Sequence, residues 1–284
     1  MKIVFRFFWR NFQKENNIFF DLLSDIKLDN CSSIEIHSVF VRPRKFYKLL
    51  NYLRIRFYRL RDKLSRSNRL YIWYSGELIT PPSNYDLTLS FTENSAKNLY
   101  WPLWATYLDV TNSGKKYDRE FILDQKELLL PRNISLTSKL NWRICAFISN
   151  DVAWRSDLIS QLEEFGCIDL YGATNGKAME YKYDVASNYV FQLCFENIIS
   201  DGYVTEKPIE AWLCGNIPIY AGGDTFGYLN KSAMIDCSKT PTGSIPSFIL
   251  KEIALRKENY LRINEPILSK KFDFTMLRQS INKI

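Results

Sequence analysis

Residues 189–223 decide the fold, and they read YVFQLCFENIISDGYVTEKPIEAWLCGNIPIYAGG. The apolar run 190–195 has the length and composition of a buried strand. A helix is expected to begin after Thr205, which can cap it, and to end at Gly215. Residues 217–220 then have the composition of another strand. The stretch therefore predicts a strand–loop–helix–strand unit of a parallel α/β sheet.

Polar side chains gather between the first strand of this unit and its helix. Asn197 follows the strand, and Tyr203, Glu206 and Lys207 surround the expected helix start. In a parallel sheet that start lies at the carboxyl edge, where free N–H groups and the helix dipole favour phosphate. Glu206 suits sugar hydroxyls better, because like charges repel. The chemistry indicates a bound nucleotide diphosphate; the alternative is a capped helix with a surface Glu–Lys pair.

The order FEN, five spacer residues, YVTEK and then GNIPIY resembles the donor-binding signature of the α-1,3-fucosyltransferases, the family 10 glycosyltransferases. The resemblance is strong over about 142–237. It implies the GT-B architecture, with two Rossmann-like α/β domains whose parallel sheets face each other across a cleft, and GDP-fucose as the donor. It also implies an Arg after a strand-plus-Asn segment, contacting the pyrophosphate, as suits a guanidinium. The donor-binding residues implied are Arg155, Asn197, Tyr203, Glu206 and Lys207.

The chain of 284 residues is long enough for two domains with a core each. Residues 131–139 have the composition of an interdomain linker. We therefore expect an acceptor-binding domain over 1–138 and a donor-binding domain over 139–284. The final twenty residues are expected to cross back to the first domain, as the resemblance suggests.

A candidate catalytic base follows the strand expected over 69–74. Glu77 comes just past that strand, after Gly76, which lets the chain turn toward a cleft. The surrounding stretch is similar, more loosely, to the acceptor-domain motif of the family, in which such an acid is taken to be the general base. Asp86 and Glu93 are the rival carboxylates. The structural alternative for Glu77 is a cap on the following turn.

Residues 98–108, NLYWPLWATYL, are dense in aromatic side chains. Aromatic faces bind sugar rings through C–H contacts, and the family has a similar aromatic-Pro-Leu segment. Trp101 and Trp104 are therefore candidate acceptor-binding residues. The alternative is that they belong to the core.

The Cys and His content argues against metal and disulfide frameworks. Six Cys are scattered without a CxxC pair, and His37 is the single His, so reduced thiols in the cytoplasm are expected. A Ser-His-Asp catalyst would have to use His37. No Asp-x-Asp pair stands in a strand–loop context, so we expect no metal and no cofactor. No transmembrane run and no signal-peptide core are visible.

Residues 42–69 carry eleven Lys or Arg and one acid, Asp62. Within them, residues 45–64 place apolar side chains three or four apart and basic ones on the other faces. One interpretation is a helix resting on anionic lipid at the inner face of the cytoplasmic membrane. The other is a helix packed on its own sheet with a solvated face. No nucleic-acid-binding motif accompanies the charge, so nucleic acid is not an expected partner.

We therefore expect an inverting glycosyltransferase that moves L-fucose from GDP-fucose to a hydroxyl of an oligosaccharide or lipid-linked glycan. Synthesis of a surface polysaccharide, such as a lipopolysaccharide O-antigen, is the expected setting. Two alternatives stay open. One is transfer of another nucleotide-activated deoxysugar by the same fold. The other is a non-catalytic, membrane-associated protein that binds a GDP-sugar.

Overall fold

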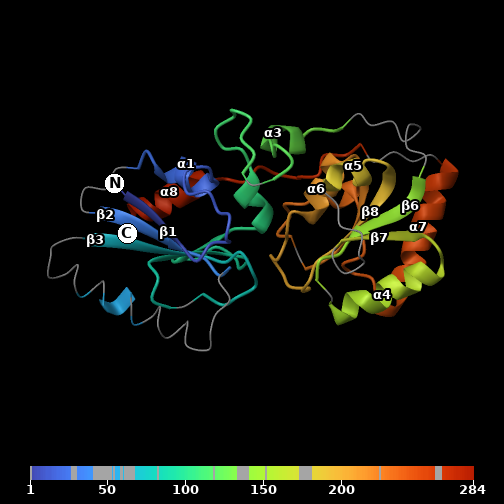
Figure 1. Cartoon of the computed structure of the whole chain (residues 1–284), viewed down its shortest axis with the longest axis horizontal. Helices are drawn as coiled ribbons and strands as arrows, with labels where there is room; N and C mark the ends of the chain where they lie inside the picture. The colour runs from blue at the N-terminus through green and yellow to red at the C-terminus, as the bar shows by residue number, and fades with distance from the viewer. Residues whose placement is uncertain are drawn as a thin grey trace. The chain divides into compact units, whose positions relative to one another are not determined.

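Two parallel sheets of five strands, each with its own helices, make up the computed structural model (Figure 1). The chain divides into unit 1, residues 1–122 with 272–284, and unit 2, residues 123–271. The two sheets confirm the α/β class predicted above. The structure describes residues 2–26, 31–40, 53, 55–57, 60, 68–81, 83–117, 119–132, 141–150, 152–172, 181–223, 225–259 and 264–284.

The sheet of unit 1 follows the order of the chain, and all its strand pairs are parallel. Its strands are β1 (Lys2–Arg6), β2 (Cys31–His37), β3 (Asn68–Tyr74), β4 (Leu87–Ser90) and β5 (Asn98–Tyr100). Helix α1 (Ile18–Leu23) lies between β1 and β2 in the chain. It begins after Asn17, whose side chain accepts a hydrogen bond of 2.9 Å from the Phe20 N–H, as expected of an N-cap.

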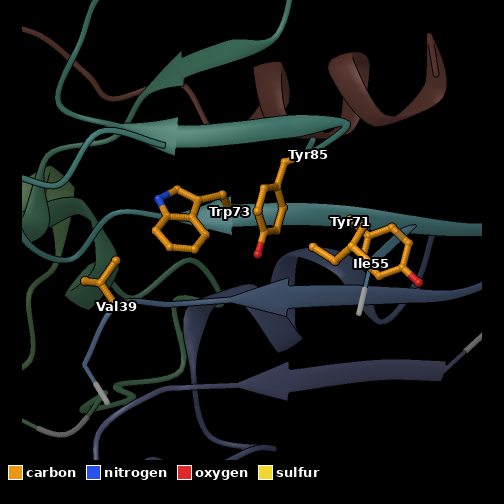
Figure 2. Packing of buried hydrophobic residues seen from close by; sticks show 5 residues of the cluster. All are labelled: Val39, Ile55, Tyr71, Trp73 and Tyr85. Carbon is orange, nitrogen blue, oxygen red and sulfur yellow. The ribbon is translucent and has the colours of Figure 1, made fainter. Parts of the chain in front are cut away.

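One face of the unit 1 sheet is covered by the aromatic cluster in Figure 2. Tyr71 and Trp73 stand two apart on β3 and so share a face. Val39, Ile55 and Tyr85 pack against them, and all five side chains are buried. Ile55, a helical residue of the basic segment 42–69, therefore packs against this sheet.

The sheet of unit 2 has the order β10-β9-β8-β6-β7, again with parallel pairs throughout. Strand β8 is buried along its whole length, which explains its nearly continuous apolar sequence. The five strands are β6 (Asn141–Phe147), β7 (Ile168–Tyr171), β8 (Tyr189–Phe195), β9 (Ile217–Ala221) and β10 (Ile235–Asp236). The helices of this unit are α3 (Gln125–Leu128), α4 (Ala153–Glu164), α5 (Lys182–Ala186), α6 (Lys207–Leu213) and α7 (Ile245–Asn259).

The division between the units falls at 122/123 instead of the predicted 138/139. The reason is that α3 and the residues after it are bonded to unit 2. Arg132 donates to the carbonyl oxygens of Trp212, at 2.5 Å, and Asn216, at 2.8 Å, at the end of α6. The guanidinium therefore adds hydrogen bonds to one carbonyl in the last turn of α6 and one just beyond it.

The C-terminal segment 272–284 belongs to unit 1, as the predicted crossing implies. Its helix α8 (Thr275–Asn282) lies against α1, where Arg278 Nε donates to the Leu22 carbonyl at 3.1 Å (Figure 1). Phe272 packs edge-on against Trp101, with ring centroids 5.4 Å apart. The segment therefore completes the core of unit 1.

The predicted basic helix over 45–64 lies largely outside the described residues. Of this stretch, 53, 55–57 and 60 are described and helical, and Ile55 is buried. Leu53, Phe57 and Leu60 are exposed by 50%, 64% and 63%. No helix in the described part of the chain is long and apolar enough to cross a membrane.

Candidate functional site: the carboxyl edge of the second sheet

The strand order of unit 2 reverses between β6 and β8. From β6 the chain goes to β7 on one side and returns to β8 on the other. The loops that follow β6 and β8 therefore diverge, and in open α/β sheets ligands bind in the crevice at such a point. Residues 148–155 follow β6, and residues 196–206 follow β8.

Arg155 and Asn197, which are far apart in sequence, meet at this edge. Arg155 lies in the first turn of α4, and its Nη1 donates to Asn197 Oδ1 at 3.1 Å. Its Nη2 donates to the Asn150 carbonyl. Trp154 Nε1 donates to the Asn197 carbonyl at 3.2 Å, and its ring stacks on Phe195. Two predicted donor residues are thus brought together, and Arg155 is held in place with a buried side chain.

Glu196 is a third member of this edge, which the sequence interpretation did not assign. Its carboxylate is fully buried and accepts the N–H and hydroxyl of Thr205, at 2.8–3.0 Å, and Lys207 Nζ, at 3.0 Å. Burial raises the pKa of Glu196, while Lys207 and Thr205 act to lower it. The expected capping by Thr205 is wrong, because its side chain is bonded to Glu196; the N-cap of α6 is Glu206. The sequence signal for this pair is an acidic residue at the end of a buried strand with a Lys eleven residues further on.

The loop after β9 touches the loop after β8 through two glycines. A Cβ on Gly223 would lie 2.1 Å from the Ser200 carbonyl oxygen, and one on Gly222 would lie 3.1 Å from Glu196 Cγ. Neither position has room for a side chain without a shift of its neighbours. The glycines therefore let the backbone pack directly on the loop that carries the site.

The other predicted donor residues differ in their exposure. Glu206 is partly exposed, as is Lys207. Tyr203 is buried, with 2% of its surface exposed, so its ring is packed inside the loop instead of facing solvent. Lys182, the first residue of α5, forms an ion pair of 2.8 Å with Glu210.

Glu77 lies in unit 1, on the turn that follows β3, as predicted. The turn is held by Ser75, whose N–H donates to the Leu89 carbonyl at 2.8 Å. A Cβ on Gly76 would lie 2.2 Å from the Phe40 ring, so a larger residue here would require that ring to move. The Glu77 side chain is exposed. An exposed carboxylate on a fixed turn has the accessibility that a general base needs.

The two rival carboxylates have other surroundings. Asp86 Oδ2 accepts a hydrogen bond from the Tyr71 N–H at 2.8 Å, which joins the residue before β4 to strand β3. Glu93 is exposed, in the loop between β4 and β5. Asp86 therefore has a structural task, and Glu93 is the rival with an accessible side chain.

The structure corrects the interpretation of Trp101 and Trp104 as acceptor-binding residues. Their side chains are 1% and 0% exposed, and Trp101 Nε1 donates to Thr106 Oγ1 at 3.1 Å. Both indoles pack against Phe272, which reaches them from the C-terminal segment. They are core residues, because a segment remote in sequence covers the faces that a sugar would need.

His37 is also a core residue. It lies between Tyr85, whose hydroxyl is 2.8 Å from Nδ1, and Glu35, whose Oε2 is 3.3 Å from Nε2. With 1% of its surface exposed, it is not placed to activate a serine at a surface. Within the described ranges, no group of three or more His, Cys, Asp or Glu is placed to hold a metal ion.

Comparison with known proteins adds sequence relatives. Residues 137–264 match the family model described as Glycosyltransferase family 10 (fucosyltransferase) C-term. A putative fucosyltransferase of Acanthamoeba polyphaga mimivirus is 26% identical over 76% of this chain and 37% of its own length. An alpha-(1,3)-fucosyltransferase of Helicobacter pylori is 49% identical over 49 residues, 17% of this chain and 10% of its own length. The chain thus spans well under half of these relatives.

Solved structures extend the likeness to the whole chain. An alpha1,3-fucosyltransferase structure aligns with a TM-score of 0.67 and 17% identity, covering 100% of this chain and 89% of that one. A structure of alpha1,3-fucosyltransferase with GDP-fucose aligns with a TM-score of 0.64 and 18% identity, covering 99% and 89%. The shared architecture is the GT-B fold. The chain therefore has the fold of these fucosyltransferase structures, and its residues 137–264 match the C-terminal model of glycosyltransferase family 10.

Proposed function

We propose that the protein is an inverting fucosyltransferase that moves L-fucose from GDP-fucose to a hydroxyl of a glycan acceptor. The observation that carries this proposal is the contact between Arg155 and Asn197 at the switch point of unit 2, beside the Glu196–Lys207 pair. Two cations, an amide and a carboxylate at one sheet edge suit a sugar diphosphate. The relatives named as fucosyltransferases make GDP-fucose the donor to test first.

In this mechanism the acceptor hydroxyl attacks the anomeric carbon, and the bond from that carbon to the β-phosphate oxygen breaks. Glu77 takes the hydroxyl proton as general base. Arg155 and Lys207 stabilise the negative charge that develops on the departing GDP. Asn197 and Glu206 orient the donor, and the buried Tyr203 supports the loop by packing. No metal or cofactor is assigned a step.

A donor screen tests the proposal. Purified protein with a panel of glycan acceptors is given GDP-fucose, other GDP- and UDP-sugars, and EDTA in half of the reactions, with products read by mass spectrometry. We expect transfer of a deoxyhexose from GDP-fucose, undiminished by EDTA. Transfer only from another nucleotide sugar would overturn the choice of donor. Loss of activity in EDTA, restored by manganese, would overturn metal-free transfer.

We also propose that the acceptor is a lipid-linked glycan of surface polysaccharide synthesis, met at the inner face of the cytoplasmic membrane. Leu53, Phe57 and Leu60 support this, because they are exposed at spacings of four and three within the strongly basic segment 42–69. Basic residues near an anionic surface contribute roughly 1 kcal/mol each. Apolar side chains that face outward add burial in the interface.

Vesicle co-sedimentation at low salt tests the membrane contact. Phe57→Ser should reduce binding to vesicles of anionic lipid, and added salt should release the wild type. Phe165→Ser is the matched control, since Phe165 is 61% exposed on unit 2. Equal binding by both variants, or no binding by the wild type, would contradict the proposal.

A further inference from the structure

We propose that Glu196 is a positioning residue whose buried carboxylate fixes the ammonium group of Lys207 where the donor diphosphate binds. This inference rests on the proposed function and deepens it. Three features carry the inference: the orientation of the carboxylate, the partial exposure of Lys207, and the contrast with a second ion pair on α6.

The carboxylate of Glu196 is held from two directions. The Thr205 N–H donates to Oε1 at 2.8 Å, and its hydroxyl lies 3.0 Å from Oε1 and 2.8 Å from Oε2. The strand end is also fixed, because the Glu196 N–H donates to the Ala221 carbonyl at 2.9 Å. With the backbone and both oxygens held, Oε2 has one direction left in which to accept Lys207.

The ammonium group of Lys207 is bonded to the fixed carboxylate of Glu196 and remains accessible to solvent. Its Nζ lies 3.0 Å from Glu196 Oε2, and its side chain is 22% exposed while that of Glu196 is 0% exposed. An ammonium has three N–H donors, so a bond to Glu196 leaves capacity for phosphate oxygens. A lysine stem has much rotamer freedom, and ordering it before the donor arrives removes that cost from binding.

A second Lys–carboxylate pair gives the contrast. Glu210, within α6, accepts Lys182 Nζ at 2.8 Å, so the two pairs are similar in length. Glu196 begins the loop that holds Asn197, whereas Glu210 lies inside the helix and takes no part in the proposed donor contacts. Glu210→Gln is therefore a matched control for loss of an ion pair.

A double-mutant cycle tests the inference. The variants are Glu196→Gln, Lys207→Ala, the double variant and Glu210→Gln, with kcat and KM measured for GDP-fucose and thermal unfolding followed for each. We expect Glu196→Gln to lower kcat/KM roughly 10- to 100-fold, the range for a hydrogen bond to a charged group. In the Lys207→Ala background the same change should have little effect, because residues acting through one contact are not additive. Glu210→Gln should stay near the wild-type rate.

An equal loss from Glu196→Gln in both backgrounds would overturn the inference, as would a lower melting temperature with normal turnover. If Glu196→Gln does not fold, Thr205→Val carries the test, since it removes a donor to the carboxylate and keeps the shape. It should lower kcat/KM by roughly 3- to 10-fold, again only when Lys207 is present. Wild-type protein that binds no GDP in calorimetry would refute the proposed function itself. Normal wild-type turnover with additive variants refutes only the role of Glu196.

Discussion

Unit 1 and unit 2 are both built on five parallel strands, but they differ in the order of those strands. In unit 1 each strand is added beside the preceding one, so successive loops follow one another along the sheet edge. In unit 2 the order reverses at β6, and the loops after β6 and β8 diverge around one point. Arg155 and Asn197 meet at that point, whereas Glu77 in unit 1 stands on an exposed turn. The reversed strand order of unit 2 brings the residues after two different strands together at one point, which the sequential order of unit 1 does not do.

The largest expected effect tests whether unit 1 contributes chemistry at all. Glu77→Gln keeps the shape of the side chain and removes its basicity, so transfer should fall roughly 10²- to 10⁴-fold. GDP binding in calorimetry should be unchanged, because the proposed donor-binding residues lie in unit 2. Glu93→Gln is the control, since Glu93 is also exposed. If Glu93→Gln is inactive and Glu77→Gln is active, the general base is Glu93 instead of Glu77.

Glu35 tests the stability of unit 1. Burial alone would raise the pKa of this carboxyl, but bonds from His37 and Arg6 outweigh it and lower the pKa from 4.5 to about 2. The ionised form therefore stabilises the fold above pH 4.5, and this contribution is lost as the pH falls toward 2. At pH 7 Glu35→Gln should lower the free energy of unfolding by about 3 kcal/mol.

The measurement is urea unfolding between pH 2 and pH 7. The gap between Glu35→Gln and wild type should narrow as the pH falls from 4.5 to 2. Glu15→Gln, at an exposed position, serves as the control and should follow the wild type throughout. A gap that does not change with pH would show that the charge of Glu35 is not what stabilises unit 1.

Lys207 tests the donor edge of unit 2. Lys207→Ala should weaken GDP binding by roughly 1.5–3 kcal/mol, the range for hydrogen bonds to charged groups. Calorimetry measures this directly, with Lys251→Ala on the exposed face of α7 as the control for loss of one positive charge. If the two variants bind GDP equally well, Lys207 is not part of the donor site.

Gly223 gives the smallest expected effect. Gly223→Ala would place a methyl group 2.1 Å from the Ser200 carbonyl oxygen, and relieving that overlap should cost about 1–3 kcal/mol of stability. Gly243→Ala is the matched control, because its Cβ would meet nothing within 4 Å. Thermal unfolding compares the two. A harmless Gly223→Ala would show that the loops of unit 2 tolerate movement, which would weaken the contrast with unit 1.

Sequence reasoning succeeded where local pattern and topology coincide. The apolar run of β8 and the stop at Gly215 are properties of neighbouring residues, and both are found as predicted. Thr205 was misread, because its partner Glu196 lies nine residues away across a loop. Trp101 was misread for a related reason: two of the rings that pack against it, those of Phe272 and Phe274, belong to the C-terminal segment. Contacts between remote segments leave no mark in a local pattern.

The return of residues 272–284 to unit 1 has a consequence for biosynthesis. Phe272 packs on the indoles of Trp101 and Trp104, so the core of unit 1 lacks this part until the whole of unit 2 has been translated. Most chains fold their N-terminal domain first. In this chain unit 2 is contiguous and can fold while unit 1 still exposes its aromatic residues. Chaperones that bind the nascent protein should therefore meet a folded unit 2 and a unit 1 whose aromatic core is still incomplete.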